Sequence, residues 1–258
     1  MTTRWPKFAA ITGFCGGFSL LELVLALALA ALLLLGLVQI VAAASAASGL
    51  QRNQAQIQDR ARLAIGVLSK AIREAGYRPE PWNDAFSPLA LTSENLDGAN
   101  AAGDRLALRT WSDLNCFDNR NPDVSDEGNP HFYIRESIFD VSSGRNLTRE
   151  CRYGPGPTEL TTQVRRQGFL PGVESFQVLY GEDRNGDGNI ERWVAAGQWS
   201  DARRVLGVRI GLLLAGEDAV VEPSAAQLQV LDVATAVPPD GRLRRVFEIA
   251  TSLRGRLP

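Results

Sequence analysis

The sequence contains few of the residue types that most catalytic and nucleic-acid-binding sites use. It has one histidine, His131, and three cysteines among 258 residues. A single histidine excludes a multi-histidine metal site, and no nucleophile motif accompanies it, so we expect no enzyme. The 27 basic and 29 acidic residues give a formal net charge of −2. A protein that binds a nucleic-acid duplex normally carries a clear basic surplus, so we expect no nucleic-acid partner.

The apolar residues are concentrated near the start of the chain. Residues 18–47 read FSLLELVLALALAALLLLGLVQIVAAASAA, with one charge, Glu22, and no proline. A helix of this length spans about 45 Å, more than the roughly 30 Å of a bilayer's hydrocarbon core. Arg4 and Lys7 precede the run without any acid. The positive-inside rule then favours a cytoplasmic N-terminus and an exported C-terminal bulk.

A cleaved secretory signal is the alternative for this run. The apolar region of such a signal covers about 7–15 residues, and a small-residue cleavage site follows it. Residues 18–47 are about twice that length, although Ala44–Ala46 imitates a cleavage site. Glu22 argues against a cleaved signal. A carboxylate inside a membrane helix costs about 2.5–3.5 kcal/mol on insertion scales, so it needs a partner or a functional use. An amine made by cutting before Phe18 in a neighbouring copy would pair with it.

The heptapeptide GFSLLEL at residues 17–23 resembles the class III signal of type IV pilins and pseudopilins. In that family a prepilin peptidase cuts after the glycine and methylates the new first residue. The resemblance implies a leader at residues 1–17, a cut between Gly17 and Phe18, and N-methylation of Phe18. It also implies that Glu22 guides the helix of residues 18–47 into the growing filament.

The proposed cut changes the cysteine count from odd to even. It removes Cys15 and leaves Cys116 and Cys151. In an oxidising compartment, two cysteines in one domain are most simply a disulfide. Two buried free thiols remain the alternative.

The helix is expected to continue beyond the membrane segment through residues 48–77. Apolar residues recur there at helical spacing, at Ile57, Ala61, Ala64, Leu68, Ile72 and Ala75. This pattern is typical of an amphipathic helix with one buried face. Gly76 and Pro79 provide the stop signal.

Residues 78–258 are expected to form a β-rich globular head. Strand-like runs occur at residues 105–112, 131–141, 161–167, 173–181, 204–215 and 244–253. Alternation of apolar and polar residues in these runs is typical of half-buried antiparallel strands. The predicted fold class is α+β: a long N-terminal helix with a membrane-spanning first half, packed on an antiparallel β-sheet head, as in type IV pilins.

Several later motifs are similar to PilW-type minor pilins. These are the helix end Arg73-Glu74-Ala75-Gly76-Tyr77, the stretch Tyr180–Asp183 with the Asp-Gly loop after it, and the strand that begins at Arg244. The segment of residues 79–172 resembles no family that we can place.

An acidic loop at residues 183–191 has two interpretations. Oxygen-bearing side chains occupy alternate positions, at Asp183, Asn185, Asp187, Asn189 and Glu191. This spacing matches the start of an EF-hand-like loop and makes these residues candidate calcium ligands. Position 12 of that pattern is Val194, where a carboxylate is required, and Asn-Gly and Asp-Gly are also common hairpin turns. A polar turn without metal therefore stays open.

The resemblance implies a minor pilin subunit of a type IV pilus. Such a subunit primes assembly and lies near the pilus tip, first in the inner membrane and later outside the cell, where pili serve motility and adhesion. Its partners would be the prepilin peptidase and other minor and major pilins. A minor pseudopilin of type II secretion and a membrane-anchored periplasmic binding protein are the alternatives.

Overall fold

The computed structural model describes residues 17, 19–87, 90–98, 103–121, 128 and 131–256. The chain divides into two compact units, Met1–Ser48 and Gly49–Pro258. We call the second of these the head unit. Helix α1 (Leu20–Glu74) contributes residues to both units.

Within the head unit, one face of α1 is buried. All six residues of the predicted apolar stripe are buried, which is the pattern of an amphipathic helix with one face against a core. Two polar residues, Asn53 and Ser69, share this face. The helix ends at Glu74, and Gly76 follows with φ of 78°, a left-handed conformation that suits glycine after a helix. The Gly76 N–H donates to Arg109 O at 2.9 Å, which ties the helix end to the first strand.

Ten strands and two short 3₁₀ helices follow α1 in the described part of the chain. In chain order they are β1 (Leu106–Ser112), β2 (Tyr133–Val141), β3 (Asn146–Gly154), β4 (Thr161–Pro171), β5 (Val173–Glu182), β6 (Arg192–Val194), η1 (Ala202–Arg204), β7 (Val205–Ala219), β8 (Ala226–Val230), β9 (Val233–Val237), β10 (Arg242–Ser252) and η2 (Arg254–Arg256).

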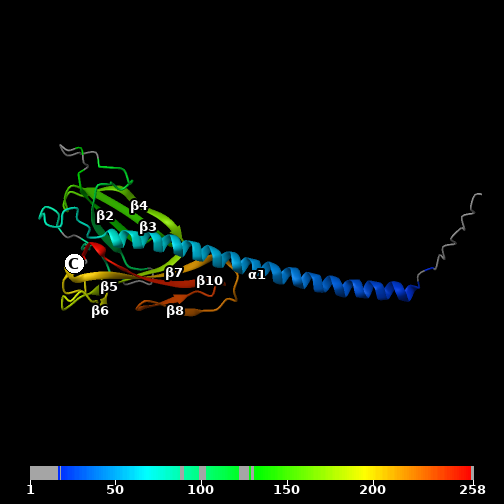
Figure 1. Ribbon diagram of the computed structural model, residues 1–258. Coiled ribbons are helices and arrows are strands. Elements are labelled where there is room, and N and C mark those ends of the chain that lie inside the picture. The colour runs from blue at the N-terminus through cyan, green and yellow to red at the C-terminus, as the bar shows by residue number, and fades with distance from the viewer. Residues whose placement is uncertain are drawn as a thin grey trace, which may run out of the picture. The chain divides into compact units, whose positions relative to one another are not determined.

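The strands form two four-stranded sheets and a hairpin. The first sheet has the order β1-β2-β3-β4, the second has β10-β7-β5-β6, and β8 pairs with β9. Every pairing is antiparallel. In Figure 1 the strands β2, β3 and β4 lie on one side of the head part of α1, and β5, β7 and β10 lie on the other.

The main core lies where α1 meets both sheets. Its fully buried members include Ile57 and Leu68 of α1, Phe139 of β2, and Phe176 and Tyr180 of β5. The predicted α+β class, with a long apolar N-terminal helix and antiparallel sheets, is therefore confirmed. The head contains two sheets where the sequence led us to expect one.

Each of the six predicted runs contains a strand. Four further strands, β3, β6, β8 and β9, were not predicted from the sequence. Strand β3 carries Arg149, Glu150 and Arg152, charges that we did not expect in a strand. Two of these are paired within or across the sheet, since Arg152 contacts Glu150 at 2.7 Å and Glu136 at 3.3 Å. Such pairing reduces the cost of burying charge beside a sheet.

Candidate functional site

The first unit presents an exposed apolar helix. Every residue of α1 from Leu20 to Ser48 is exposed. This helix is long and apolar enough to cross a membrane by its length and composition. A soluble protein rarely exposes so long an apolar surface, because hydration of that surface is unfavourable. The segment therefore fits a membrane anchor.

Glu22 lies in the first turn of this helix and is exposed. The N-terminal end of a helix carries a partial positive charge, so a carboxylate is favoured at this position. Gly17, on one side of the expected cut, is also exposed. Phe18, on the other side, lies outside the described residues, as does the leader before Gly17. The cut and the methylation stay predictions.

Cys116 and Cys151 form a disulfide, so the predicted disulfide is present. Cys151 lies in β3, and Cys116 lies in the loop that follows β1. The bond packs against Tyr153, with Tyr133 and Val164 at its margin. It closes a segment of 35 residues and joins the loop after β1 to the first sheet.

The acidic loop brings three of its five predicted ligands together. Carboxylate oxygens of Asp183, Asp187 and Glu191 all lie within 4.8 Å of one another. Asp183 is buried and accepts hydrogen bonds from the N–H groups of Gly186 at 2.5 Å and Gly188 at 2.9 Å. Both glycines have positive φ, 82° and 87°, so a residue with a side chain would be strained there.

The two asparagines of the loop contact Asp187. Asn185 donates its side-chain amide to one Asp187 oxygen at 3.1 Å, and the Asn189 N–H donates to the other at 2.8 Å. The backbone hydrogen bond from Asn189, followed by the Asn185 amide, lowers the pKa of Asp187. The loop therefore holds its exposed carboxylate ionised and presents three carboxylates to one point. Hard oxygen ligands of this kind suit calcium.

A buried glutamate next to this loop, Glu182, was not predicted as a site residue from the sequence. Glu182 ends β5 and is fully buried. It accepts hydrogen bonds from the Ser200 N–H at 2.6 Å and hydroxyl, and from Arg192 Nε at 2.7 Å. Burial alone would raise the pKa of Glu182, but the Ser200 and Arg192 interactions outweigh burial and lower it to about 2. Nothing in the local sequence distinguishes Glu182 from the loop acids.

Asn53 is a second polar residue that the sequence reading missed. Its side-chain oxygen accepts hydrogen bonds from the N–H groups of Glu217 at 3.1 Å and Asp218 at 3.3 Å. Its amide nitrogen donates to Gly49 O at 3.1 Å and to Asp218 Oδ2 at 3.2 Å. Asn53 thus fixes α1 to the end of β7. The sequence offers one sign that Asn53 is buried: it lies four residues before Ile57, in line with the apolar stripe of the helix.

Comparison with known proteins found similarities to a pilus-assembly family and to a pilin of known structure. A family model described as Type IV Pilus-assembly protein W matches residues 132–255, a little under half of the chain. Among solved structures, a type IV-like pilin from Thermus thermophilus is similar, with 18% sequence identity and a TM-score of 0.49, over 78% of this chain and 98% of that one. No curated protein matches this chain.

The family match covers strands β2 to β10, which are the parts that carry the Asp183 loop and the closing strand. It confirms the resemblance to PilW-type pilin-like proteins. The match supports a pilin-type role for the matched part of the head; it does not include α1.

Proposed function

We propose that this chain is a non-catalytic minor pilin that primes assembly of a type IV pilus and lies near the pilus tip. The proposal rests chiefly on one observation. An exposed apolar helix with a single charge, Glu22, belongs to the same chain as a region that matches a pilus-assembly family at residues 132–255.

The physical role of the helix changes between two environments. In the inner membrane, lipid covers the apolar surface that begins at Leu20, and the head lies in the periplasm. In the filament, the helices of neighbouring pilins replace the lipid. Transfer between two apolar environments costs little, so the direction of transfer depends on the few polar groups in the segment.

Glu22 is the polar group that gives this transfer its specificity. In the proposed sequence, prepilin peptidase cuts between Gly17 and Phe18 and methylates Phe18. The new terminal amine then carries a positive charge. A neighbouring subunit's amine pairs with Glu22, because a carboxylate without a partner is costly in an apolar surrounding. The inferred partners are therefore prepilin peptidase, major pilins and other minor pilins.

We also propose that the Asp183 loop binds calcium through Asp183, Asp187 and Glu191, with Asn185 and Asn189 completing the ligand set. The ion would neutralise three convergent carboxylates and stiffen the loop between β5 and β6. Its role would be structural. A stiff loop near the pilus tip would also provide a surface for adhesion.

A complementation experiment tests the assembly role. A strain that lacks the gene and cannot retract its pili would receive the wild-type chain, Glu22→Ala or the control Glu159→Ala. Glu159 is an exposed acid of the head. We expect wild type and control to restore surface pili and Glu22→Ala to leave the number at the deletion level, with normal amounts of each chain in the membrane. Full restoration by Glu22→Ala would contradict the charge-pairing mechanism.

The deletion strain also separates the proposed role from its nearest alternative. A minor pilin predicts loss of surface pili with protein secretion unchanged. Loss of secretion with normal pili would instead identify a minor pseudopilin of type II secretion.

A further inference from the structure

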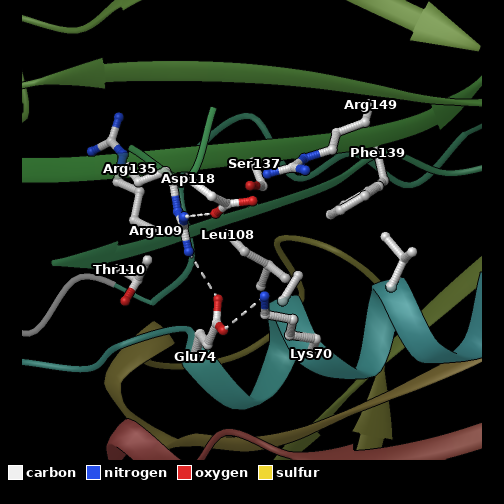
Figure 2. Close-up of a pocket in the computed structure, with 12 residues that line it drawn as sticks. Lys70, Glu74, Leu108, Arg109, Thr110, Asp118, Arg135, Ser137, Phe139 and Arg149 are labelled. Carbon is white, nitrogen blue, oxygen red and sulfur yellow. Dashed lines mark hydrogen bonds and ion pairs between the residues drawn. The ribbon is translucent and has the colours of Figure 1, made fainter. Parts of the chain in front are cut away.

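A cavity of about 170 Å³ lies within the head unit, between α1 and the first sheet. Val67, Lys70 and Glu74 line it from α1, and Arg135, Ser137 and Arg149 line it from β2 and β3. Figure 2 shows these side chains together with Asp118, which comes from the loop after β1. The cavity is smaller than the roughly 300–1,000 Å³ of sites for drug-sized ligands. It has room for a group of only a few heavy atoms.

One arginine of the cavity is fully engaged by acids. Arg135 contacts Glu74 through one guanidinium nitrogen at 3.0 Å and Asp118 through another at 3.1 Å. Lys70 lies 3.8 Å from the second oxygen of Glu74. Only 9% of the Arg135 side chain is exposed, so these contacts are largely shielded from solvent. Both carboxylates of the cavity are therefore committed to Arg135 and Lys70.

The side chain of a second arginine that lines the cavity, Arg149, has no ion-pair partner in the described part of the chain. The side chain of Arg149 in β3 forms neither a hydrogen bond nor an ion pair with any residue in the described ranges, and its Nε is buried without a partner. Figure 2 shows its side chain directed from β3 toward Ser137 and Asp118. Burial lowers the pKa of Arg149 and the positive charge of Arg135 lowers it further, whereas the charges of Asp118 and Glu74 oppose this shift without outweighing it.

The charges of the cavity leave a positive excess. Lys70, Arg135 and Arg149 are cations, whereas Glu74 and Asp118 are the acids. The remaining arginine, Arg109, directs its Nε to Glu136 at 2.8 Å. A half-buried guanidinium with an unpaired N–H is costly unless an anion completes it. Guanidinium groups bind carboxylates best, because two parallel N–H donors match two oxygens.

We propose that this cavity binds one carboxylate group, which pairs with the Arg149 guanidinium. A carboxylate is small enough for the cavity and supplies the single negative charge that its lining lacks. The group has two possible sources: a small soluble carboxylate, or the Asp or Glu side chain of another pilin that docks on this side of the head. The chemistry of recognition is the same in both.

The soluble source is tested on the full-length chain in detergent, with sodium acetate as the probe and chloride adjusted to constant ionic strength. A ligand that binds only the folded state raises the melting temperature in a saturable way. We expect a rise of a few degrees for wild type and none for Arg149→Gln. The control Arg165→Gln, at an exposed arginine of β4, should respond as wild type does.

A spectroscopic readout keeps the test valid if Arg149→Gln folds poorly. In the wild-type chain labelled with ¹⁵N-arginine, acetate should shift the Arg149 Nε–H resonance. Arg149→Lys keeps the positive charge but loses the paired donors, so we expect it to fold and to bind acetate at least threefold more weakly.

The protein source is tested by affinity between this chain and the other purified pilins of the same organism. We expect Arg149→Gln to weaken the complex at least tenfold, acetate to compete, and Arg165→Gln to have no effect. The acetate arm uses the chain alone, so its result does not depend on the pilus role. The proposal is overturned if acetate leaves both the melting temperature and the Arg149 resonance unchanged and Arg149→Gln binds other pilins normally. An equal acetate response in Arg149→Gln would also overturn it.

Discussion

Asn53 and Asp218 are joined by a hydrogen bond of 3.2 Å, although 165 residues separate them in sequence. Asn53 lies on the buried face of α1, close to the start of the head unit, and Asp218 lies near the end of β7. A Cβ at the neighbouring Gly216 would collide with the tip of the Asn53 side chain, so a larger residue there would displace Asn53 from these hydrogen bonds. The head therefore contacts both ends of this part of the helix through polar groups, here through Asn53 and at the far end through the ion pair of Glu74 with Arg135, with the apolar stripe packed between them.

Replacement of Asn53 should loosen this attachment. Asn53→Ala removes one acceptor and one donor and leaves the partly buried N–H groups of Glu217 and Asp218 without their partner. We expect a loss of about 1–3 kcal/mol in the free energy of unfolding. Thermal or urea unfolding of the full chain in detergent measures this loss. Gln58→Ala, at an exposed position five residues further along α1, is the control and should change stability by less than about 0.5 kcal/mol. Equal losses in both variants would contradict the role of Asn53.

Glu182 should make the stability of the head depend on acid pH. Its pKa falls from an ordinary 4.5 to about 2 in the folded state. A lowered pKa contributes stability that is present above 4.5 and is lost as pH falls toward 2. We expect Glu182→Gln to be less stable than wild type at pH 6 and the difference to shrink between pH 4.5 and pH 2. The measurement is melting temperature against pH, with the exposed Glu159→Gln as control. A difference that stays constant over this range would count against an ionised Glu182.

The disulfide should stabilise the head when it is oxidised. A closed segment of this length contributes about 3–4 kcal/mol in the chain-entropy model. We expect a reductant to lower the melting temperature of wild type and to leave the double variant Cys116→Ala/Cys151→Ala unchanged. Mass spectrometry of the mature chain should show an increase of about two mass units on reduction, because two hydrogens are added to one bond. An unchanged mass would mean that the two thiols are free.

The Asp183 loop should respond to calcium. Asp187→Ala removes one of the three convergent carboxylates, so we expect it to abolish a calcium-dependent rise in melting temperature that wild type shows. In chelator, the variant and wild type should melt within about a degree of each other, since an exposed side chain contributes little by itself. Asp84→Ala, at an exposed acid elsewhere in the head, should retain the calcium response. A loss of stability by Asp187→Ala that is the same in calcium and in chelator would refute the metal role.

Periodic patterns made the helix and most strands predictable from sequence. The stripe from Ile57 to Ala75 has helical spacing and is buried throughout the head part of α1. The alternation around Val178 and Ile210 likewise corresponds to strands that pair directly, with Val178 opposite Ile210. In both cases one buried face repeats at the period of the element, so local sequence carries the information.

The strands and residues that the sequence did not predict depend on contacts with residues outside their own local segment. The hairpin β8-β9 turns through Leu231, which has φ of 53°, where the usual signal is glycine or asparagine. In strand β3, Arg152 pairs with Glu136 on the neighbouring strand and with Glu94, which lies before β1. Cys116 and Cys151 could be paired from sequence because only two cysteines remain after the expected cut. The sequence could not show that the Arg149 side chain lacks an ion-pair partner among the described residues, because this depends on the two acids of the cavity, Glu74 and Asp118, both pairing with Arg135.

The mature N-terminus, determined by mass spectrometry on the chain purified from its own host, tests the pilin account most directly. The account predicts that the first residue is Phe18, with a methyl group on its amine and the leader absent. A chain that begins after Ala46, or one that retains Met1, would show that no prepilin peptidase acts on it and would contradict the assembly mechanism.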